Sequence, residues 1–153
     1  MQELIGNFWT EVETGKYEAI CCTTNKIVKT SGGLVMGAGI AKEFQTRYPE
    51  LPSYFGTKLA ENPKLNLMVY DGKRCDLGYY VIAFPTKHDW RESSSMALIE
   101  HSALELKHFA DCFGIERVLM TRPGCGLGGL TWSGVKQRIE RYLDDRFVVI
   151  ERN

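Results

Sequence analysis

Two glycine-rich segments hold the residues of this sequence that are best suited to binding a ligand. Residues Gly124–Leu130 carry four glycines in seven positions, and Gly32–Gly39 carry a second set of four. Each segment follows an apolar run of strand length and precedes a stretch with helical spacing. A glycine turn before a helix N-terminus binds anions, because glycine permits φ > 0 and lets backbone N–H groups approach a phosphate. Two such turns predict a ligand with two phosphates, or one pyrophosphate held from both sides.

Neither glycine segment matches a common nucleotide-binding motif. The stretch Gly37–Lys42 lacks the third glycine of the dinucleotide-binding pattern, and neither segment ends in the Gly-Lys-Ser/Thr of a P-loop. The sequence therefore disfavours ordinary NAD-dependent dehydrogenases and P-loop NTPases.

A polar and aromatic stretch between the two segments offers side chains for a reaction. It runs from Thr86 to Arg91, directly after the apolar run Ile82–Phe84. Lys87 has three interpretations: a charge clamp beside phosphate, a partly desolvated nucleophile toward a sugar C1, or a solvated loop residue. Trp90 and Arg91 either contact a base or phosphate, or Trp90 seals the loop against the core. Spacing alone leaves these alternatives open.

No other catalytic or metal-binding pattern is present. His88 and Asp89 are adjacent, so we expect their side chains to diverge rather than form a catalytic dyad. The five cysteines include no Cys-x-x-Cys pair, and Cys21 and Cys22 lie in an apolar run where free thiols behave as small hydrophobes. We therefore expect no metal site and no cofactor.

The elements that position these residues follow from hydrophobic periodicity. Helical spacing predicts helices from Ile40 to Tyr48, from Ile99 to Phe113 and from Trp132 to Leu143. Strand-length apolar runs occur at Glu3–Ile5, Ala19–Thr23, Leu65–Tyr70, Tyr79–Phe84, Arg117–Thr121 and Phe147–Ile150. Several runs are continuous, which is typical of strands covered on both faces, so we predict an α/β sandwich with a mixed, mostly parallel sheet. Ligands of such sheets bind beyond the carboxyl ends of the strands, where both glycine segments would lie.

Length and composition indicate a single domain spanning residues 1–153, without linker or internal repeat. Nineteen basic and nineteen acidic residues give no net charge, so bulk attraction to nucleic acid is not indicated, although a local basic patch is compatible with this balance. The sequence has neither a signal peptide nor eighteen consecutive apolar residues. We expect a cytoplasmic monomer without a membrane partner.

Three motifs, in this order along the chain, resemble the ligand-binding segments of macrodomains. They are Asn25 with Gly33–Phe44, then Phe84–Lys87 with Trp90 and Arg91, and then Gly124–Trp132. The resemblance runs from about Gly6 to the C-terminus and is strongest to the DarG-type DNA ADP-ribosyl glycohydrolase branch. The terminal ADP-ribose glycohydrolase of animals is a more distant match.

The macrodomain resemblance implies a three-layer α/β/α fold with ADP-ribose as ligand. DarG-type proteins remove ADP-ribose from thymidine in single-stranded DNA, and the animal relative removes it from carboxylate side chains. In both, the lysine matched here by Lys87 is catalytic and attacks C1 of the distal ribose. The resemblance therefore implies an ADP-ribosyl glycohydrolase that acts on nucleic acid, with Trp90 and Arg91 as nucleic-acid contacts.

The resemblance also assigns individual binding roles. Asn7 matches an aspartate that accepts from the adenine amino group, and Asn25 matches an asparagine near the distal ribose. The first segment would wrap the distal ribose and pyrophosphate, and the second would hold the α-phosphate side. The residues expected to bind ADP-ribose are Asn7, Phe8, Asn25, Gly33, Leu34, Val35, Met36, Gly37, Ala38, Gly39, Ile40, Thr86, Pro123, Gly124, Cys125, Gly126, Leu127 and Gly128.

Two departures and two alternative functions accompany this interpretation. Gly128 stands where the animal enzyme has an aspartate, which favours the DarG-like function, and the insertion Lys26–Ser31 lengthens the first loop.

One alternative function is that of an ADP-ribose-1″-phosphate phosphatase, an activity of a yeast branch that shares the Gly-x-Gly-Ile-Ala loop and the following Arg47–Pro49. The other is a non-catalytic ADP-ribose reader in which Lys87 acts only by its charge.

Overall fold

Six strands form one mixed sheet at the centre of the molecule. In the computed structural model, which describes residues 1–153, the strand order is β1-β6-β5-β2-β4-β3. The strands are β1 (Gln2–Gly6), β2 (Ala19–Thr24), β3 (Met68–Tyr70), β4 (Tyr80–Pro85), β5 (Val118–Thr121) and β6 (Phe147–Arg152). Only the edge strand β3 is antiparallel to its neighbour. The predicted mixed, mostly parallel sheet is therefore confirmed.

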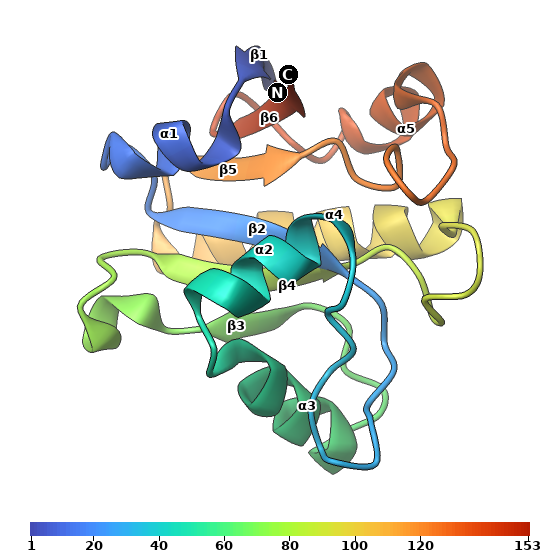
Figure 1. Cartoon of the computed structure of the whole chain (residues 1–153). Coiled ribbons are helices and arrows are strands. Elements are labelled where there is room, and N and C mark those ends of the chain that lie inside the picture. Colours follow the sequence, from blue (N-terminus) through green and yellow to red (C-terminus); the bar gives the residue numbers. More distant parts are fainter.

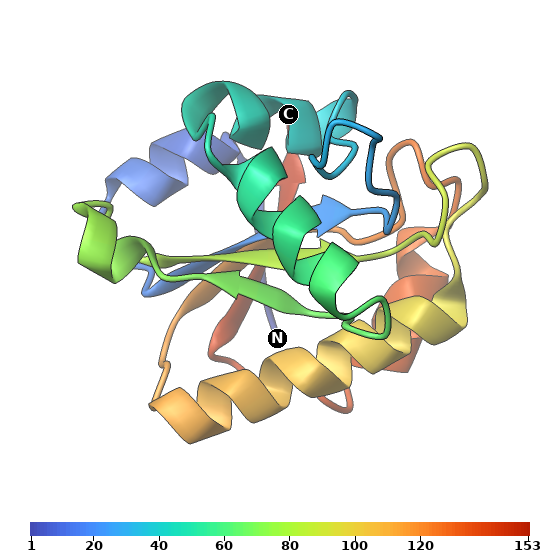
Figure 2. The same ribbon diagram turned by 90° about the horizontal axis from the view of Figure 1, so that it is seen from below.

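Helices cover both faces of the sheet, as Figures 1 and 2 show. They are α1 (Phe8–Glu13), α2 (Gly39–Arg47), α3 (Leu51–Glu61), α4 (Met96–Phe113), α5 (Trp132–Ile139) and a short 3-10 helix, η1 (Gly72–Cys75). Side chains alternate across β2, so that Ile20 and Cys22 pack with α1, α2 and α3, whereas Ala19 and Cys21 pack with α4 and α5. The two resulting cores confirm the three-layer α/β/α arrangement and the burial of both thiols. No helix is both long and apolar enough to span a bilayer.

The ends of several elements differ from the predicted ones. The helix predicted to reach Leu143 ends at Ile139, and the chain then turns so that the Leu143 carbonyl accepts from the amino group of Met1. The strand predicted from Leu65 begins at Met68, because the buried Asn66 amide donates to Ser102 and Glu105. Helix α4 is capped by the Ser95 hydroxyl and by Gly114 at φ 65°.

Two helices were not expected from periodicity. Helix α1 has only six residues, too few to show a pattern, and α3 carries a glycine within it. A Cβ at Gly56 would lie 2.0 Å from the carbonyl oxygen of Gly32, so only glycine lets α3 approach the first glycine segment this closely.

Candidate active site

A cavity of about 880 Å³ lies beyond the carboxyl ends of β2, β4, β5 and β6. Three loops meet there, and Figure 1 shows them together on the right-hand side of the sheet. They follow β2, β4 and β5, and they carry the first glycine segment, Lys87 and the second glycine segment. This cavity thus lies at the carboxyl ends of the strands, where the site is expected.

Most of the predicted site residues line this cavity. They are Asn25, Val35, Met36, Gly37, Ala38, Gly39, Ile40, Thr86, Lys87, Trp90, Gly124, Cys125, Gly126, Leu127 and Gly128. Six predicted residues do not line it, namely Asn7, Phe8, Gly33, Leu34, Pro123 and Arg91.

Two of these six residues, Asn7 and Phe8, lie at the start of α1. The Asn7 Oδ1 accepts from the Thr10 N–H at 3.0 Å and caps α1, so the oxygen expected to read adenine already has a partner. Phe8 is fully buried and packs against Trp9 and Phe44. Its side chain is therefore part of the core and does not line the cavity. Pro123 is likewise buried, between β5 and the second glycine segment.

The first glycine segment divides into two halves with different surroundings. Gly33 packs against Pro52, Leu34 is fully buried, and the Leu34 N–H donates to the Pro52 carbonyl at 2.8 Å. This half joins the loop to α3, because glycine lets the two backbones pack closely. Only the half from Val35 onward faces the cavity.

The N-terminus of α2 supplies an anion-binding feature of the cavity. Ala38 is the N-cap residue and its side chain makes no capping bond, so no side chain satisfies the first N–H groups of the helix. Gly39 has φ 58°, a conformation that favours glycine and sets the turn into α2. Uncapped N–H groups and the positive end of the helix dipole attract negative charge. The cavity wall at Gly39–Ala41 therefore has the features expected for holding phosphate.

The second glycine segment is fixed by close packing at some positions and open at others. Gly124 has φ 77°, and a Cβ there would lie 2.7 Å from Ile99 Cδ1. A Cβ at Gly128 would lie 2.1 Å from Ser94 Oγ and 2.6 Å from the Gly124 carbonyl oxygen. Gly126 is different, because its φ is not positive and a Cβ there would meet no atom within 4 Å. Gly124 and Gly128 thus shape the loop, whereas Gly126 leaves space in the cavity.

Lys87 connects the two glycine segments. Its Nζ donates to the Leu127 carbonyl at 3.5 Å and makes no ion pair or other hydrogen bond. The Leu127 side chain reaches across to α2, where its Cδ1 lies 3.5 Å from the Cβ position of Gly39. The ammonium group therefore keeps donors free for a ligand, beside both candidate phosphate-binding elements.

Asn25 holds the first loop in place. Its Nδ2 donates to the Val35 carbonyl and its Oδ1 accepts from the Ile27 N–H, both at 2.9 Å. The lengthened loop is thereby closed at its base, and a backbone bond from Lys26 to the His88 carbonyl joins it to the loop after β4. Asn25 lines the cavity, and it keeps one amide N–H and one lone pair of Oδ1 for a ribose.

Trp90 and Arg91 have different surroundings although they are neighbours. Trp90 is 53% exposed and lines the cavity, so it does not seal the loop against the core. Arg91 is bound by the Asp89 carboxylate, with Nε 2.9 Å from Oδ1, and this bond lowers the pKa of Asp89 to about 2. Asp89 therefore pairs with Arg91 and not with His88, and the charge of Arg91 is largely neutralised.

Sequence reasoning missed nine residues of the cavity wall: Thr23, Thr24, Ala41, Ser94, Thr121, Arg122, Ile150, Glu151 and Arg152. Several of them end β5 and β6, so the rule that ligands bind beyond strand carboxyl ends could have found them. Thr24 and Ser94 are 4% and 9% exposed, and their hydroxyls have no hydrogen-bond partner. Buried polar groups without partners are uncommon outside functional sites.

Comparison with known proteins shows which family the chain resembles. No family model matches the chain. The DNA ADP-ribosyl glycohydrolase of Mycobacterium tuberculosis is 33% identical over 128 residues, which are 82% of this chain and 36% of that protein. The chain thus spans about a third of the length of the curated relatives it matches.

Solved structures match over the whole chain. The macrodomain of Thermus aquaticus DarG has a TM-score of 0.80 at 27% identity, covering 99% of this chain and 97% of that one. Thermosipho africanus DarTG in complex with ADP-ribose has a TM-score of 0.79 at 22% identity, covering 100% of this chain and 42% of that one. The predicted three-layer fold is therefore the fold of solved macrodomains.

Proposed function

Because the chain belongs to the macrodomain family and resembles DNA ADP-ribosyl glycohydrolases, we propose that it binds ADP-ribose and releases it from a conjugate by hydrolysis. We further propose that the conjugate is thymidine-linked ADP-ribose in single-stranded DNA. Residues 1–153 would act as one macrodomain, and the monomeric state stays a prediction.

One observation carries this proposal: Lys87 lies between two anion-binding elements and has almost no protein partner. The uncapped N-terminus of α2 and the second glycine segment face the same cavity, and Lys87 Nζ is bonded only to Leu127 of the latter. The pyrophosphate would lie against these two elements, which brings the distal ribose to the end of β4. The complex of Thermosipho africanus DarTG with ADP-ribose is consistent with this ligand.

The proposed reaction uses Lys87 as nucleophile. After the ammonium of Lys87 loses a proton, Nζ attacks C1 of the distal ribose and the bond from C1 to the base nitrogen breaks. The electron pair of that bond leaves with the base, which takes up a proton. Water then displaces the lysine and releases ADP-ribose. The hydroxyls of Thr24 and Ser94, which lack protein partners, are placed in the wall of the same cavity.

We propose that the surface around Trp90 binds single-stranded DNA mainly by stacking on bases and less by attraction to phosphate charge. Trp90 is exposed at the cavity, and unpaired bases stack on such side chains. Arg91 contributes less than expected, because Asp89 holds its guanidinium. The phosphatase alternative rests on the Gly-x-Gly-Ile-Ala loop, which lines the cavity, and on Arg47–Pro49, which lies elsewhere. Arg47 stacks over Trp9 at 4.1 Å and Tyr48 is buried. These side chains do not line the cavity.

A titration and a turnover assay test the proposal together. Calorimetry with ADP-ribose should show one site per chain, and no binding at millimolar ligand, about −4 kcal/mol, would remove the proposal. Turnover is then measured on ADP-ribosylated single-stranded DNA, ADP-ribosylated protein and ADP-ribose-1″-phosphate. Turnover of ADP-ribose-1″-phosphate alone would favour the phosphatase alternative. ADP-ribose binding without turnover of any of the three substrates would favour the non-catalytic reader.

Variants of Lys87 separate catalysis from charge. We expect Lys87→Ala and Lys87→Arg both to abolish release, because arginine keeps the charge but is not a nucleophile at neutral pH. Lys87→Arg should still bind ADP-ribose. The matched control is Lys42→Arg, an exposed lysine of α2 outside the cavity, which should turn over normally. Near-normal turnover by Lys87→Arg would reduce Lys87 to an electrostatic role.

A further inference from the structure

One carboxylate stands close behind the N-terminus of α2, the element that receives the pyrophosphate under the proposed function, on which this step therefore rests. Glu43 is the only acidic residue of α2 and lies four positions after Gly39. Four residues of an α-helix rise about 6 Å, so the two residues lie one turn apart on the same side of the helix. The wall at Gly39–Ala41 lines the cavity, whereas Glu43 does not. Its charge therefore lies near the proposed phosphate position without belonging to the cavity wall.

An unpaired carboxylate at this position would oppose phosphate binding. The first N–H groups of α2 have no side-chain cap, and the positive end of the helix dipole attracts a phosphate there. A negative charge one turn away acts on the same phosphate with the opposite sign, because charges interact over such distances wherever solvent screens them incompletely. The Glu43 carboxylate must therefore be neutralised if α2 is to hold the pyrophosphate.

Arg152, at the end of β6, supplies the neutralising cation. Its Nη1 lies 2.7 Å from Oε2 of Glu43 and its Nη2 lies 2.6 Å from Oε1. Bidentate pairing is the strong form of an arginine–carboxylate contact. Glu43 makes no other ion pair, and its remaining hydrogen bond comes from the neutral Nε1 of Trp9 at 3.0 Å. Neutralisation of the Glu43 carboxylate therefore depends mainly on Arg152.

Glu43 carries its charge at neutral pH. The bonds from Arg152 are the largest influence on its carboxyl and lower its pKa, and the bond from Trp9 and the charge of Arg47 act in the same direction. Partial burial acts against them without reversing the shift. The Glu43 and Arg152 side chains are 38% and 39% exposed, so solvent screens both charges in part and we expect moderate effects.

The same carboxylate joins three elements beside the cavity. Trp9 lies on α1, Glu43 on α2 and Arg152 at the end of β6, and the oxygens of Glu43 accept from both of the others. A carboxylate at this place ties α2 to its neighbours, but it does so with a charge of the wrong sign for the ligand. Pairing with Arg152 allows the connection without the repulsion.

We propose that Arg152 is a positioning residue that acts through Glu43, holding α2 by this carboxylate and cancelling the repulsion that it would exert on the pyrophosphate. Removing Arg152 leaves an unpaired negative charge behind the N-terminus of α2, whereas neutralising Glu43 leaves an unpaired positive one. The two changes break the same ion pair but move the ligand affinity in opposite directions. A purely structural pair would weaken binding in both cases, and direct contact of Arg152 with the ligand would make the loss independent of Glu43.

Calorimetric titration with ADP-ribose at low salt tests the proposal on three variants. Glu43→Gln should bind about two- to fivefold more tightly than the wild type, and Arg152→Leu about fivefold more weakly. The double variant should return to within about twofold of the wild type. High salt should shrink the loss of Arg152→Leu relative to the wild type, because screening acts on repulsion between charges and not on packing. Weaker binding by Glu43→Gln, or a double variant as weak as Arg152→Leu, would overturn the proposal.

A variant that keeps the charge and a remote ion pair complete the test. Arg152→Lys keeps a cation beside Glu43 and should bind within about threefold of the wild type. A loss as large as that of Arg152→Leu would overturn the proposal, because it would mean that the guanidinium plane itself contacts the ligand. The matched control Arg138→Leu breaks an exposed pair with Glu100 away from the cavity and should bind ADP-ribose normally.

Thermal melting of each variant separates loss of fold from loss of affinity. Glu43→Gln and Arg152→Lys are conservative changes, so their two expected results test the proposal even if Arg152→Leu unfolds. Absence of ADP-ribose binding by the wild type would instead remove the proposed function itself.

Discussion

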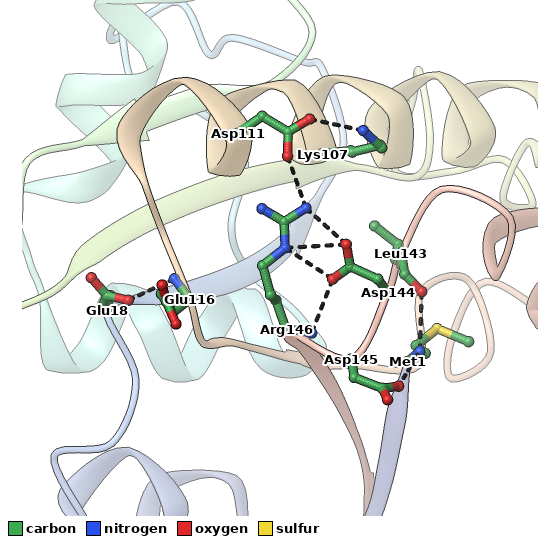
Figure 3. A network of polar contacts seen from close by, with 9 residues as sticks. All are labelled: Met1, Glu18, Lys107, Asp111, Glu116, Leu143, Asp144, Asp145 and Arg146. Atoms are coloured by element: carbon green, nitrogen blue, oxygen red, sulfur yellow. Dashed lines mark hydrogen bonds and ion pairs between the residues drawn. The ribbon is translucent and has the colours of Figure 1, made fainter.

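At the amino ends of the parallel strands charged groups are paired with one another, whereas at the carboxyl ends polar groups are left without protein partners. Figure 3 shows the amino-end network, in which Arg146 binds Asp144 and also reaches Asp111 on α4. The amino group of Met1 binds Asp145 and the Leu143 carbonyl in the same network. Within this network the charged groups satisfy one another, whereas the buried Nε of Arg117, just before β5, has no partner.

The carboxyl-end edge also holds ion pairs, such as Arg91 with Asp89 and Arg122 with Glu151, but several polar groups that line its cavity have no partner. The N-terminus of α2 has no side-chain cap, the hydroxyls of Thr24 and Ser94 have no partner, and Lys87 makes one long hydrogen bond. A buried polar group without a partner costs stability, so a protein tolerates such groups mainly where a ligand can satisfy them. We therefore expect stability to depend more on the amino-end edge of the sheet, and the proposed ligand binding to depend on the carboxyl-end edge.

Among variants that test this difference between the two edges, we expect Gly128→Val to have the largest effect on ADP-ribose binding and stability. A Cβ there would lie within 2.6 Å of the Gly124 carbonyl oxygen and closer still to Ser94 Oγ, so the loop must shift. We expect ADP-ribose binding to be lost and the free energy of unfolding to fall by about 1–3 kcal/mol. Denaturant unfolding and calorimetry measure the two effects. Normal binding by this variant would show that the second glycine segment does not shape the site.

Gly126→Val should separate the two properties. A valine there meets no protein atom within 4 Å of its Cβ and needs no positive φ, but its side chain enters the space beside the cavity. Binding should fall at least tenfold while the free energy of unfolding changes by no more than about 0.5 kcal/mol. If instead the melting temperature drops and the folded fraction binds normally, Gly126 is structural.

At the opposite edge, Arg146→Ala should change stability and leave binding intact. The substitution leaves Asp144 and Asp111 without their shared partner, with the Arg146 side chain 26% exposed in the native protein. We expect a loss of about 1 kcal/mol, because screening by solvent limits pairs near the surface. The control Arg138→Ala removes a single exposed pair with Glu100 and should cost less. Weakened ADP-ribose binding by Arg146→Ala would contradict the separation of the two edges.

Acid should weaken the amino-end edge by a smaller amount. The Arg146 guanidinium is the largest influence on the Asp144 carboxyl and lowers its pKa. A carboxyl whose folded-state pKa is depressed contributes stability above its unfolded pKa, about 4, and this contribution is lost as pH falls through the lower folded value. Melting temperature followed from pH 7 down to about pH 3 should therefore fall less steeply for Asp144→Asn than for the wild type. Parallel curves of melting temperature against pH would show that the pair of Asp144 with Arg146 contributes nothing measurable to stability.

Sequence alone determined the features that depend on nearby residues. The α/β class, the helix that ends at Phe113, and the positions of the two glycine segments all follow from patterns within about twenty residues. The motif around Lys87 belongs with them, because the end of a buried strand is visible as a change from apolar to polar residues. Helix α1 escaped prediction for the same reason, since six residues are too short for a periodic pattern.

Only the tertiary structure decided what each residue faces. It turned Gly33 and Leu34 toward α3, used Asn7 as a helix cap, and joined Arg91 to Asp89. It also brought Arg152 to Glu43 across 109 positions of the chain, because the strand order places β6 beside β1 and α2 over the sheet. Partners this distant leave no local pattern, since they arise from the packing of whole elements rather than from the spacing of neighbouring side chains.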